Sequence, residues 1–218
     1  MPQHLTPKLL KPRLERRAAL AAGLSFALTL SAPAWAQAAF DLQQLTQLLS
    51  QVKSGDAAFT EKRTVSILAQ TLESSGRLSF AAPDTFVRET LKPRREKVAV
   101  VGNSVTMSAG SRSRTVPLDS VPEAAVIMEA IRGTLTGNRE QLERHFSANV
   151  SGNAQRWLLE LVPIEPRLQE LVRSVNLAGQ LSIVREVTVI MADGDRSVMS
   201  IEPLSAPSSP AKPASAAS

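Results

Sequence analysis

The sequence predicts a mainly β protein with a few helices, in which one strongly curved antiparallel sheet forms an incomplete (half) β-barrel with helices as its lid. Three observations predict this fold. Apolar and polar residues alternate with period two over about residues 57–116, with turn signals between the runs. An apolar stripe at helical spacing follows, and the period of two resumes over about residues 155–201. The pattern therefore indicates nine or ten strands accompanied by two helical elements.

The first 36 residues predict a cleavable export signal. Basic residues precede an apolar run over residues 18–30, which leads to Ala34-Trp35-Ala36, an A-x-A cleavage site. The run has about 13 residues, whereas a membrane-spanning helix needs roughly 20. We expect cleavage after Ala36 and a soluble protein in the periplasm. Arg16-Arg17 leaves the twin-arginine route open beside the general secretion route.

Charge and residue usage exclude several classes of function. The leader carries a net charge of about +4 out of the total of +5, so no nucleic-acid partner is expected. The chain has no cysteine, which excludes disulfides, thiol catalysis, thiolate metal sites and the residue that lipid anchoring requires. His145 is the only histidine after the leader, so we expect neither a metal site nor another cofactor.

Each element in the first half of the mature chain has a local cause. Asp41 can cap a helix whose leucines recur at helical spacing, and Gly55 can end it. Turn residues such as Pro83-Asp84 and Gly102-Asn103 then separate successive alternating runs. The predicted strands cover about residues 59–67, 72–80, 85–91, 97–101, 105–109 and 112–116.

The second half begins with helices and returns to strands. Asp119 or Ser120 can cap a helix that extends to Leu135 and ends at Gly137, and a short helix follows over residues 139–145. Strands are predicted over about residues 155–162, 172–178, 181–191 and 197–201, with a helical turn at 167–171. We expect one domain over residues 37–202 and a disordered Pro/Ala/Ser tail over residues 203–218.

Several strands carry apolar residues on both faces, for example Leu158 and Leu159, which a solvated face would not show. Two interpretations stay open: the helices pack on one side as an ordinary core, or the half-barrel is hollow and receives an apolar ligand. The predicted lipid-binding residues recur at period two and are Phe59, Leu78, Phe80, Phe86, Val100, Trp157 and Leu159. The predicted lid residues are Ile127, Met128, Ile131 and Leu135.

Three short patterns occur in a characteristic order after the first helix. They are Ala57-Ala58-Phe59-Thr60-Glu61-Lys62, a stretch over residues 76–86 with Pro83 near its end, and a hairpin over residues 98–105. In this order they resemble the outer-membrane lipoprotein carrier protein family (LolA), of which the chain looks like a divergent member. The resemblance is best over about residues 40–107 and extends in element order alone to residue 201.

The resemblance implies a periplasmic carrier that shields the acyl chains of a lipoprotein or other lipid between the inner and outer membranes. It also implies an inner-membrane delivering complex and an outer-membrane acceptor as partners, and we expect a monomer. The well-studied carriers have an arginine immediately before the strand-end proline, which ties the lid shut, whereas this chain has Ala82 there. Arg63, Arg77 or Arg88 can replace that arginine only if its side chain points into the concavity.

Signals for catalysis are weak. Ser50-Gln51-Val52-Lys53 matches the S-x-x-K pattern of serine acyl-enzymes, but the overlapping Lys53-Ser54-Gly55 match reuses the same lysine, and the true motifs lie far apart in sequence. No phosphate-loop, dinucleotide or G-x-S-x-G fingerprint occurs. We therefore expect no enzyme. The alternative is a periplasmic hydrolase or glycan-modifying enzyme with an unrecognised site.

Overall fold

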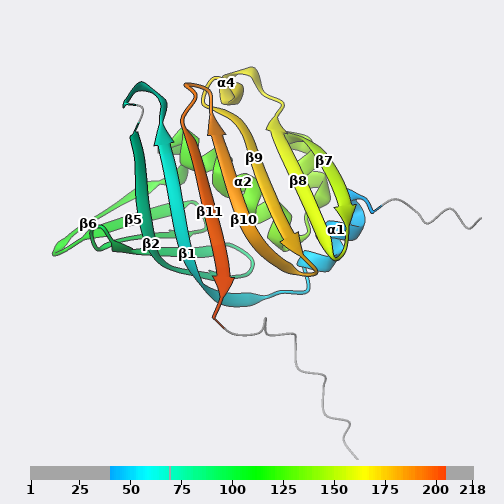
Figure 1. The fold of residues 1–218 in the computed structure, drawn as a ribbon, viewed down its shortest axis with the longest axis horizontal. Coiled ribbons are helices and arrows are strands. Elements are labelled where there is room, and N and C mark those ends of the chain that lie inside the picture. Colours follow the sequence, from blue (N-terminus) through cyan, green and yellow to red (C-terminus); the bar gives the residue numbers. More distant parts are fainter. Residues whose placement is uncertain (1–39, 69, 205–218) are drawn as a thin grey trace, which may run out of the picture. The chain divides into compact units, whose positions relative to one another are not determined.

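The computed structural model describes residues 40–68 and 70–204 (Figure 1). The predicted leader and cleavage site, and residues 205–218 of the predicted tail, lie outside the described residues, whereas Pro203, which the prediction placed in the tail, is the last residue of a strand. The helices are α1 (Leu42–Leu49), α2 (Pro122–Thr136), α3 (Arg139–His145) and α4 (Pro166–Gln169), with short 3-10 turns at Ser66–Leu68 and Leu118–Ser120. Within the described ranges, no helix is both long and apolar enough to cross a bilayer.

All the described strands belong to one antiparallel sheet of eleven strands. They are β1 (Ser54–Val65), β2 (Gln70–Ala81), β3 (Thr85–Lys92), β4 (Glu96–Val101), β5 (Ser104–Ala109), β6 (Arg112–Pro117), β7 (Phe146–Asn153), β8 (Arg156–Pro163), β9 (Val172–Gln180), β10 (Ile183–Met191) and β11 (Arg196–Pro203).

The strand order is β6-β5-β4-β3-β2-β1-β11-β10-β9-β8-β7, so the first and last strands of the chain pair in the middle (Figure 1). Two meanders, β1 to β6 and β7 to β11, thus join along β1 and β11, and α2 and α3 lie between them in sequence. The sheet stays open, with β6 and β7 at its two edges. This confirms the predicted fold class: a mainly β, open antiparallel sheet with helices.

The sheet curves around α2. Val126 and Ala130 of this helix pack with strands β7 to β10, while its Ala124, Ala125 and Met128 pack on a second group of residues from β3 to β6. From β4 to β9 a flat sheet would cover six strand spacings, roughly 29 Å, whereas a helix with its side chains is about 10–12 Å across. One helix can contact both regions only because the sheet bends toward it. We call this concave side of the sheet the helix-side face, and the opposite side the outer face.

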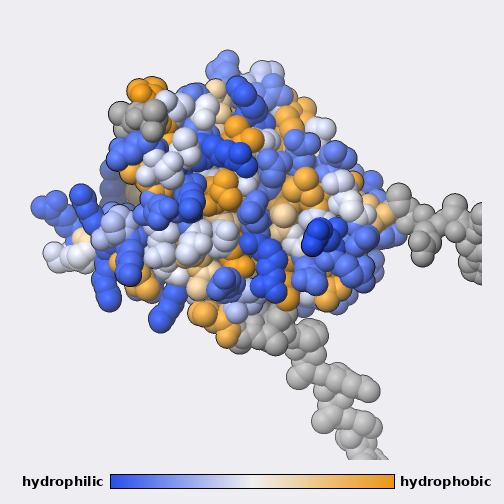
Figure 2. Space-filling model, viewed as in Figure 1, coloured by the Kyte–Doolittle hydropathy of each residue, from blue (hydrophilic) through white to orange (hydrophobic). Residues whose placement is uncertain are grey.

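The core is divided into two apolar clusters on the helix-side face. The large cluster combines leucines of α1, Val126 and Ala130 of α2 and buried residues of β7 to β10. The small cluster is built on Val100, Val105 and Leu118 beneath the start of α2. The outer face carries hydrophilic side chains intermixed with scattered apolar ones (Figure 2), among them Leu158, whose side chain is 44% exposed.

Several local expectations are confirmed. Asp41 caps α1 by accepting a hydrogen bond from the Gln44 backbone N–H at 2.8 Å. Gly137 ends α2 with φ +75°, the left-handed conformation that a residue without a Cβ adopts most easily. The short helix over residues 139–145 is α3, and the turn predicted at 167–171 is α4 (Pro166–Gln169).

Three local expectations were wrong. The predicted sheet lacked β7, because its sequence FSANVSGN has little β-forming character, and pairing with β8 compensates for it. Gly55 does not end α1, which stops at Leu49; it lies inside β1 instead. Neither Asp119 nor Ser120 caps α2, which begins at Pro122 after the uncapped Val121, because Leu118–Ser120 forms a 3-10 turn.

Candidate functional site

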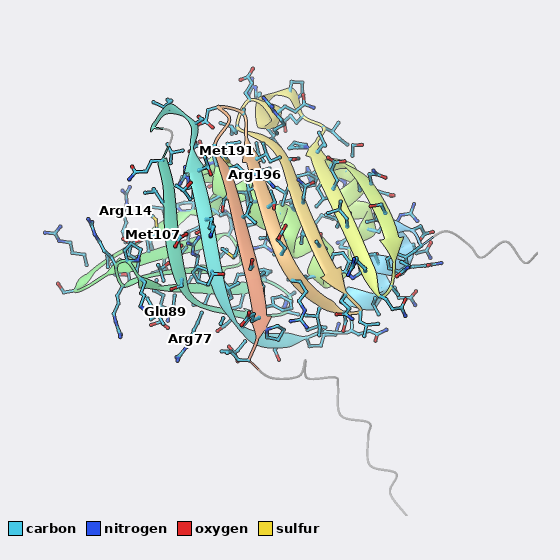
Figure 3. The ribbon with its side chains drawn as sticks, in the orientation of Figure 1. Arg77, Glu89, Met107, Arg114, Met191 and Arg196 are labelled. Carbon is cyan, nitrogen blue, oxygen red and sulfur yellow. The ribbon has the colours of Figure 1, made fainter. Side chains whose placement is uncertain are left out.

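Cross-strand register places all seven predicted lipid-binding residues on the helix-side face. Phe80 lies opposite Phe86, Phe86 opposite Val100, and the two phenyl rings are 5.0 Å apart between centroids. Leu78 lies opposite Arg88 in the neighbouring row, which continues through Val98 and Met107 to Arg114. Met107 and Arg114 are labelled in Figure 3 on the meander at the β6 edge.

The seven residues do not share one environment. Trp157 and Leu159 lie in the large cluster and are 1% and 0% exposed. The Trp157 indole donates to the Leu181 carbonyl at 2.8 Å, and a Cβ added at Gly179 would come within 2.3 Å of its ring. This part of the face is packed core in the described structure, as in the first of the two open interpretations.

The remaining five residues lie toward the other half of the sheet. Phe86 and Val100 belong to the small cluster under α2. Phe59 is buried but belongs to neither cluster, and Leu78 and Phe80 are half-buried. In the middle of the helix-side face, Phe59 is therefore buried outside both apolar clusters, while Leu78 and Phe80 are only partly covered.

The four predicted lid residues of α2 are all half-buried. Ile127 packs on the large cluster and Met128 on the small one, while Ile131 and Leu135 belong to neither among the described residues. The most buried residues of the helix are instead Val126, Ala130, Gly133 and Thr134.

Small residues explain why the most buried side of α2 differs from the predicted stripe. A Cβ added at Gly133 would come within 2.7 Å of the Leu142 side chain, so α3 approaches the backbone of α2 at this glycine. At about 100° per residue, Ile131 and Leu135 project between Ile127 and Met128, and thus between the two clusters. The predicted stripe faces the middle of the sheet rather than the interior of either cluster.

A polar centre occupies that middle region. Glu61 of β1 forms an ion pair with Arg88 of β3 and accepts hydrogen bonds from Ser74, at 2.9 Å, and from Ser197. The Arg88 guanidinium lies over the Phe59 ring, 4.8 Å from its centroid, and Nη2 also donates to Ser74 Oγ at 3.2 Å. The side chains of Glu61 and Arg88 are 14% and 35% exposed.

The electrostatics of this centre keep Glu61 ionised. Burial alone would raise the pKa of Glu61, but hydrogen bonds from Ser197 and Ser74 and the charge of Arg88 outweigh it, so the pKa is lowered below its usual 4.5. The pair is therefore a carboxylate and a guanidinium at neutral pH, with no net charge. Sequence reasoning missed this centre, although Glu61 follows Phe59 by two residues and Arg88 follows Phe86 by two.

None of the three arginines considered for the lid forms a hydrogen bond or an ion pair with α2 in the described part of the chain. Arg63 pairs with Asp195 at 3.0 Å, and Arg88 pairs with Glu61. Arg77 lies opposite Glu89 on the outer face, where Figure 3 labels both residues. The hydrogen bond between α2 and the sheet comes from the helix instead. Arg132 of α2 donates to the Gly102 carbonyl, in the turn between β4 and β5, at 2.8 Å.

Asp195 organises the turn end of the central strands. It accepts hydrogen bonds from the Ser66 backbone N–H and from Arg63, and these two interactions, in that order, lower the pKa of its carboxyl. Asp193 also stabilises this turn, because its carboxylate accepts from the Asp195 N–H at 2.9 Å. These residues are therefore structural.

Two grooves lie away from the predicted residues for the most part; polar residues predominate along the first, and the second is lined by polar and apolar residues together. The first, of about 760 Å³, runs between α1 and the connection of α2 to α3, beside Thr46, Ser50 and Asn138. The second, of about 520 Å³, surrounds Arg77 and Glu89 and includes Leu78 on its border. Neither offers an apolar lining suited to a hydrocarbon chain.

Comparison with known proteins adds a family profile. The profile described as "Outer membrane lipoprotein carrier protein LolA-like" matches residues 34–206. No curated protein matches the chain.

Among solved structures, the chain is similar to a LolA superfamily protein from Nitrosomonas europaea (10% identity, 74% of this chain and 91% of that chain covered, TM-score 0.42). It is also similar to a DUF1329 family protein from Desulfovibrio piger (10% identity, 75% and 89% covered, TM-score 0.45) and to LprF from Mycobacterium bovis (10% identity, 74% and 91% covered, TM-score 0.33).

Proposed function

Because the chain belongs to the LolA-like outer membrane lipoprotein carrier protein family, we propose that it is a periplasmic carrier. Its cargo is a lipoprotein, or another lipid, whose acyl chains it shields from water between the inner and outer membranes. It acts by binding and handing over this cargo rather than by catalysis.

One observation carries the proposal: the apolar stripe of α2 that projects between the two packed clusters. Ile131 and Leu135 are half-buried and belong to neither cluster in the described residues, and Leu78 of the sheet is likewise half-buried and outside both clusters. A helix that served only to complete the core would place its largest apolar residues inside it. Here small residues make the tight contacts, and the large ones stay available to a ligand.

The lid must move for cargo to reach the whole face. Trp157 and Leu159 are packed against neighbours in the described structure, so they can line an acyl site only after helices separate from the sheet. We propose that cargo first contacts Ile131, Leu135 and the central strands, and that further displacement of α2 opens the remainder. Whether Trp157 and Leu159 contact cargo stays a prediction.

Energetics make docking partners necessary. Shielding one acyl chain of about 15 methylenes contributes roughly 12 kcal/mol gross, at about 0.8 kcal/mol per methylene, before the cost of association. Release into water would be too slow for a shuttle, so cargo must pass directly to another apolar surface. We therefore propose an inner-membrane delivering complex and an outer-membrane acceptor.

The test is to purify the exported protein from the periplasm, extract it with organic solvent and identify bound lipids by mass spectrometry. We expect acylated lipid in amounts comparable to the protein. The double variant Ile131→Gln and Leu135→Gln should lose it, because amides in the stripe disfavour a hydrocarbon neighbour.

Leu158→Gln is the matched control, since Leu158 is exposed on the outer face and receives the same substitution. It should retain the lipid. A wild-type protein without acylated lipid, or a stripe variant that carries as much lipid as the control, would contradict the proposal.

A further inference from the structure

The polar centre on the helix-side face has hydrogen-bond donors that the protein does not use. Arg88 employs only Nη2 in its contacts with Glu61 and Ser74. Nε and Nη1 have no protein partner among the described residues, and the side chain is 35% exposed, so water satisfies these groups. The Phe59 ring contacts one face of the Arg88 guanidinium, and this contact leaves the N–H groups at the edge of the guanidinium free.

A purely hydrocarbon ligand would suit this position poorly. Arg88 lies on β3 between Leu78 and Val98, beside the small cluster, and its guanidinium covers Phe59. An acyl chain laid over Leu78 and the guanidinium would remove water from the free N–H groups, and unsatisfied donors of a charged group are costly. A ligand that binds well here must bring an acceptor oxygen to Arg88.

The charge of the centre indicates which acceptor fits. Glu61 is ionised and adjoins Arg88, so the pair is neutral as a whole. A free carboxylate or phosphate at Arg88 would gain from the guanidinium and lose through repulsion by Glu61. A carbonyl oxygen of an ester or amide takes the same hydrogen bonds without that repulsion.

We propose that Arg88 is a specificity-determining residue that binds the ester or amide carbonyl of an acylated cargo and selects it over ether-linked lipids and free fatty acids. This inference rests on the proposed carrier function and deepens it by naming the linkage that the site recognises. Ser74 and Ser197 act as positioning residues, because they hold Glu61 and thereby fix the charge beside Arg88.

The test measures the binding of three ligands with the same 16-carbon chain to the purified, delipidated chain at neutral pH: 1-palmitoylglycerol, 1-O-hexadecylglycerol and palmitate. The first two differ only in the ester carbonyl. We expect the ester to bind about tenfold more tightly than the ether, as one hydrogen bond to a charged group allows. Palmitate should also bind more weakly than the ester.

Two variants assign the effect to the centre. Arg88→Met keeps an apolar side chain of similar length and should abolish the ester-to-ether difference. Glu61→Gln leaves the Arg88 charge uncompensated and should shift the preference toward palmitate. Thermal melting of this variant checks that it is folded. If Arg88→Met fails to fold, two other results test the role of Arg88. They are the shift of preference toward palmitate in Glu61→Gln and a smaller ester-to-ether difference in Arg88→Lys.

The outcomes separate this inference from the carrier proposal. Equal binding of ester and ether by the wild type overturns the role of Arg88 and leaves the carrier function standing. An ester-to-ether difference that persists in folded Arg88→Met, or a wild type that prefers palmitate, also overturns it. If none of the three ligands binds to the wild type, the carrier proposal itself fails.

Discussion

Arg132 of α2 donates from Nη2 to the carbonyl oxygen of Gly102, at 2.8 Å, and so joins the helix to the turn between β4 and β5. The Nε of the same side chain is buried without a hydrogen-bond partner in the described residues. This contact therefore closes the helix over the sheet while leaving one donor unsatisfied.

Replacing Arg132 should loosen α2. We expect Arg132→Ala to lower the free energy of unfolding by about 1–2 kcal/mol. This loss reflects the missing hydrogen bond to Gly102 and is reduced because the substitution also removes the unpaired Nε. Hydrogen exchange should increase in α2 more than in β8 and β9. Arg144→Ala, in an exposed position on α3, serves as the control and should change neither quantity. Unchanged protection of α2 in the Arg132 variant would contradict this role.

Adjacent leucines of β8 should respond in opposite ways to one substitution. Leu159 is 0% exposed in the large cluster, whereas Leu158 is 44% exposed on the outer face. Leu159→Gln should cost about 3–5 kcal/mol of stability, through lost burial and a buried amide, and Leu158→Gln should cost under about 0.5 kcal/mol. Chemical denaturation measures both. Near-equal losses would show that the helices do not pack over Leu159.

The Glu61 ion pair should make stability depend on acid. The folded pKa of Glu61 is lowered, so its ionised form stabilises the protein above the usual value of 4.5, and this contribution disappears as the pH falls through the folded pKa. Between pH 5 and 7, Glu61→Gln should be about 1.5–3 kcal/mol less stable than the wild type, and the gap should narrow below pH 4.5.

The comparison with Glu61→Gln isolates this residue. Asp195 also has a lowered pKa and loses stabilising interactions in acid, but it does so in both proteins and cancels in the difference. Denaturant titrations at several pH values provide the measurement. A gap that stays constant down to pH 3 would show that the charge of Glu61 does not stabilise the fold.

The leader can be tested directly. We expect the exported protein to begin at Gln37, because the A-x-A site ends at Ala36. N-terminal sequencing of protein from the periplasmic fraction measures this. Retention of Met1, or recovery of the protein in membranes after a salt wash, would exclude the expected processing and location.

The success and failure of the sequence predictions have physical causes. Strong alternation predicted β2 to β5 and β8 nearly to their ends, because period two marks a strand with one buried face. The strand β7 escaped because Ser, Asn and Gly make up most of it, although Phe146, Ala148 and Val150 alternate toward the large cluster and β8 pairs along its length.

The candidate site was also predicted only in part. Period two places Phe59 and Glu61 on one face, but the pairing of Glu61 with Arg88 depends on the register of β1 and β3 across the intervening β2. That register includes an irregularity at Ser75 and Gly76, which alternation does not predict. The predicted stripe of α2 did not include its most buried residues, because Gly133 permits a closer contact with Leu142 than any large apolar residue.

A single titration shows whether this chain binds an acyl chain between α2 and the sheet. Purified, delipidated protein is titrated with a fluorescent long-chain acyl probe, and unlabelled 1-palmitoylglycerol is then used to displace it. We predict saturable binding of one probe per chain with a Kd in the micromolar range or below, about 8 kcal/mol or more, and full displacement by the unlabelled ester. No saturable binding up to roughly 100 μM would contradict the account.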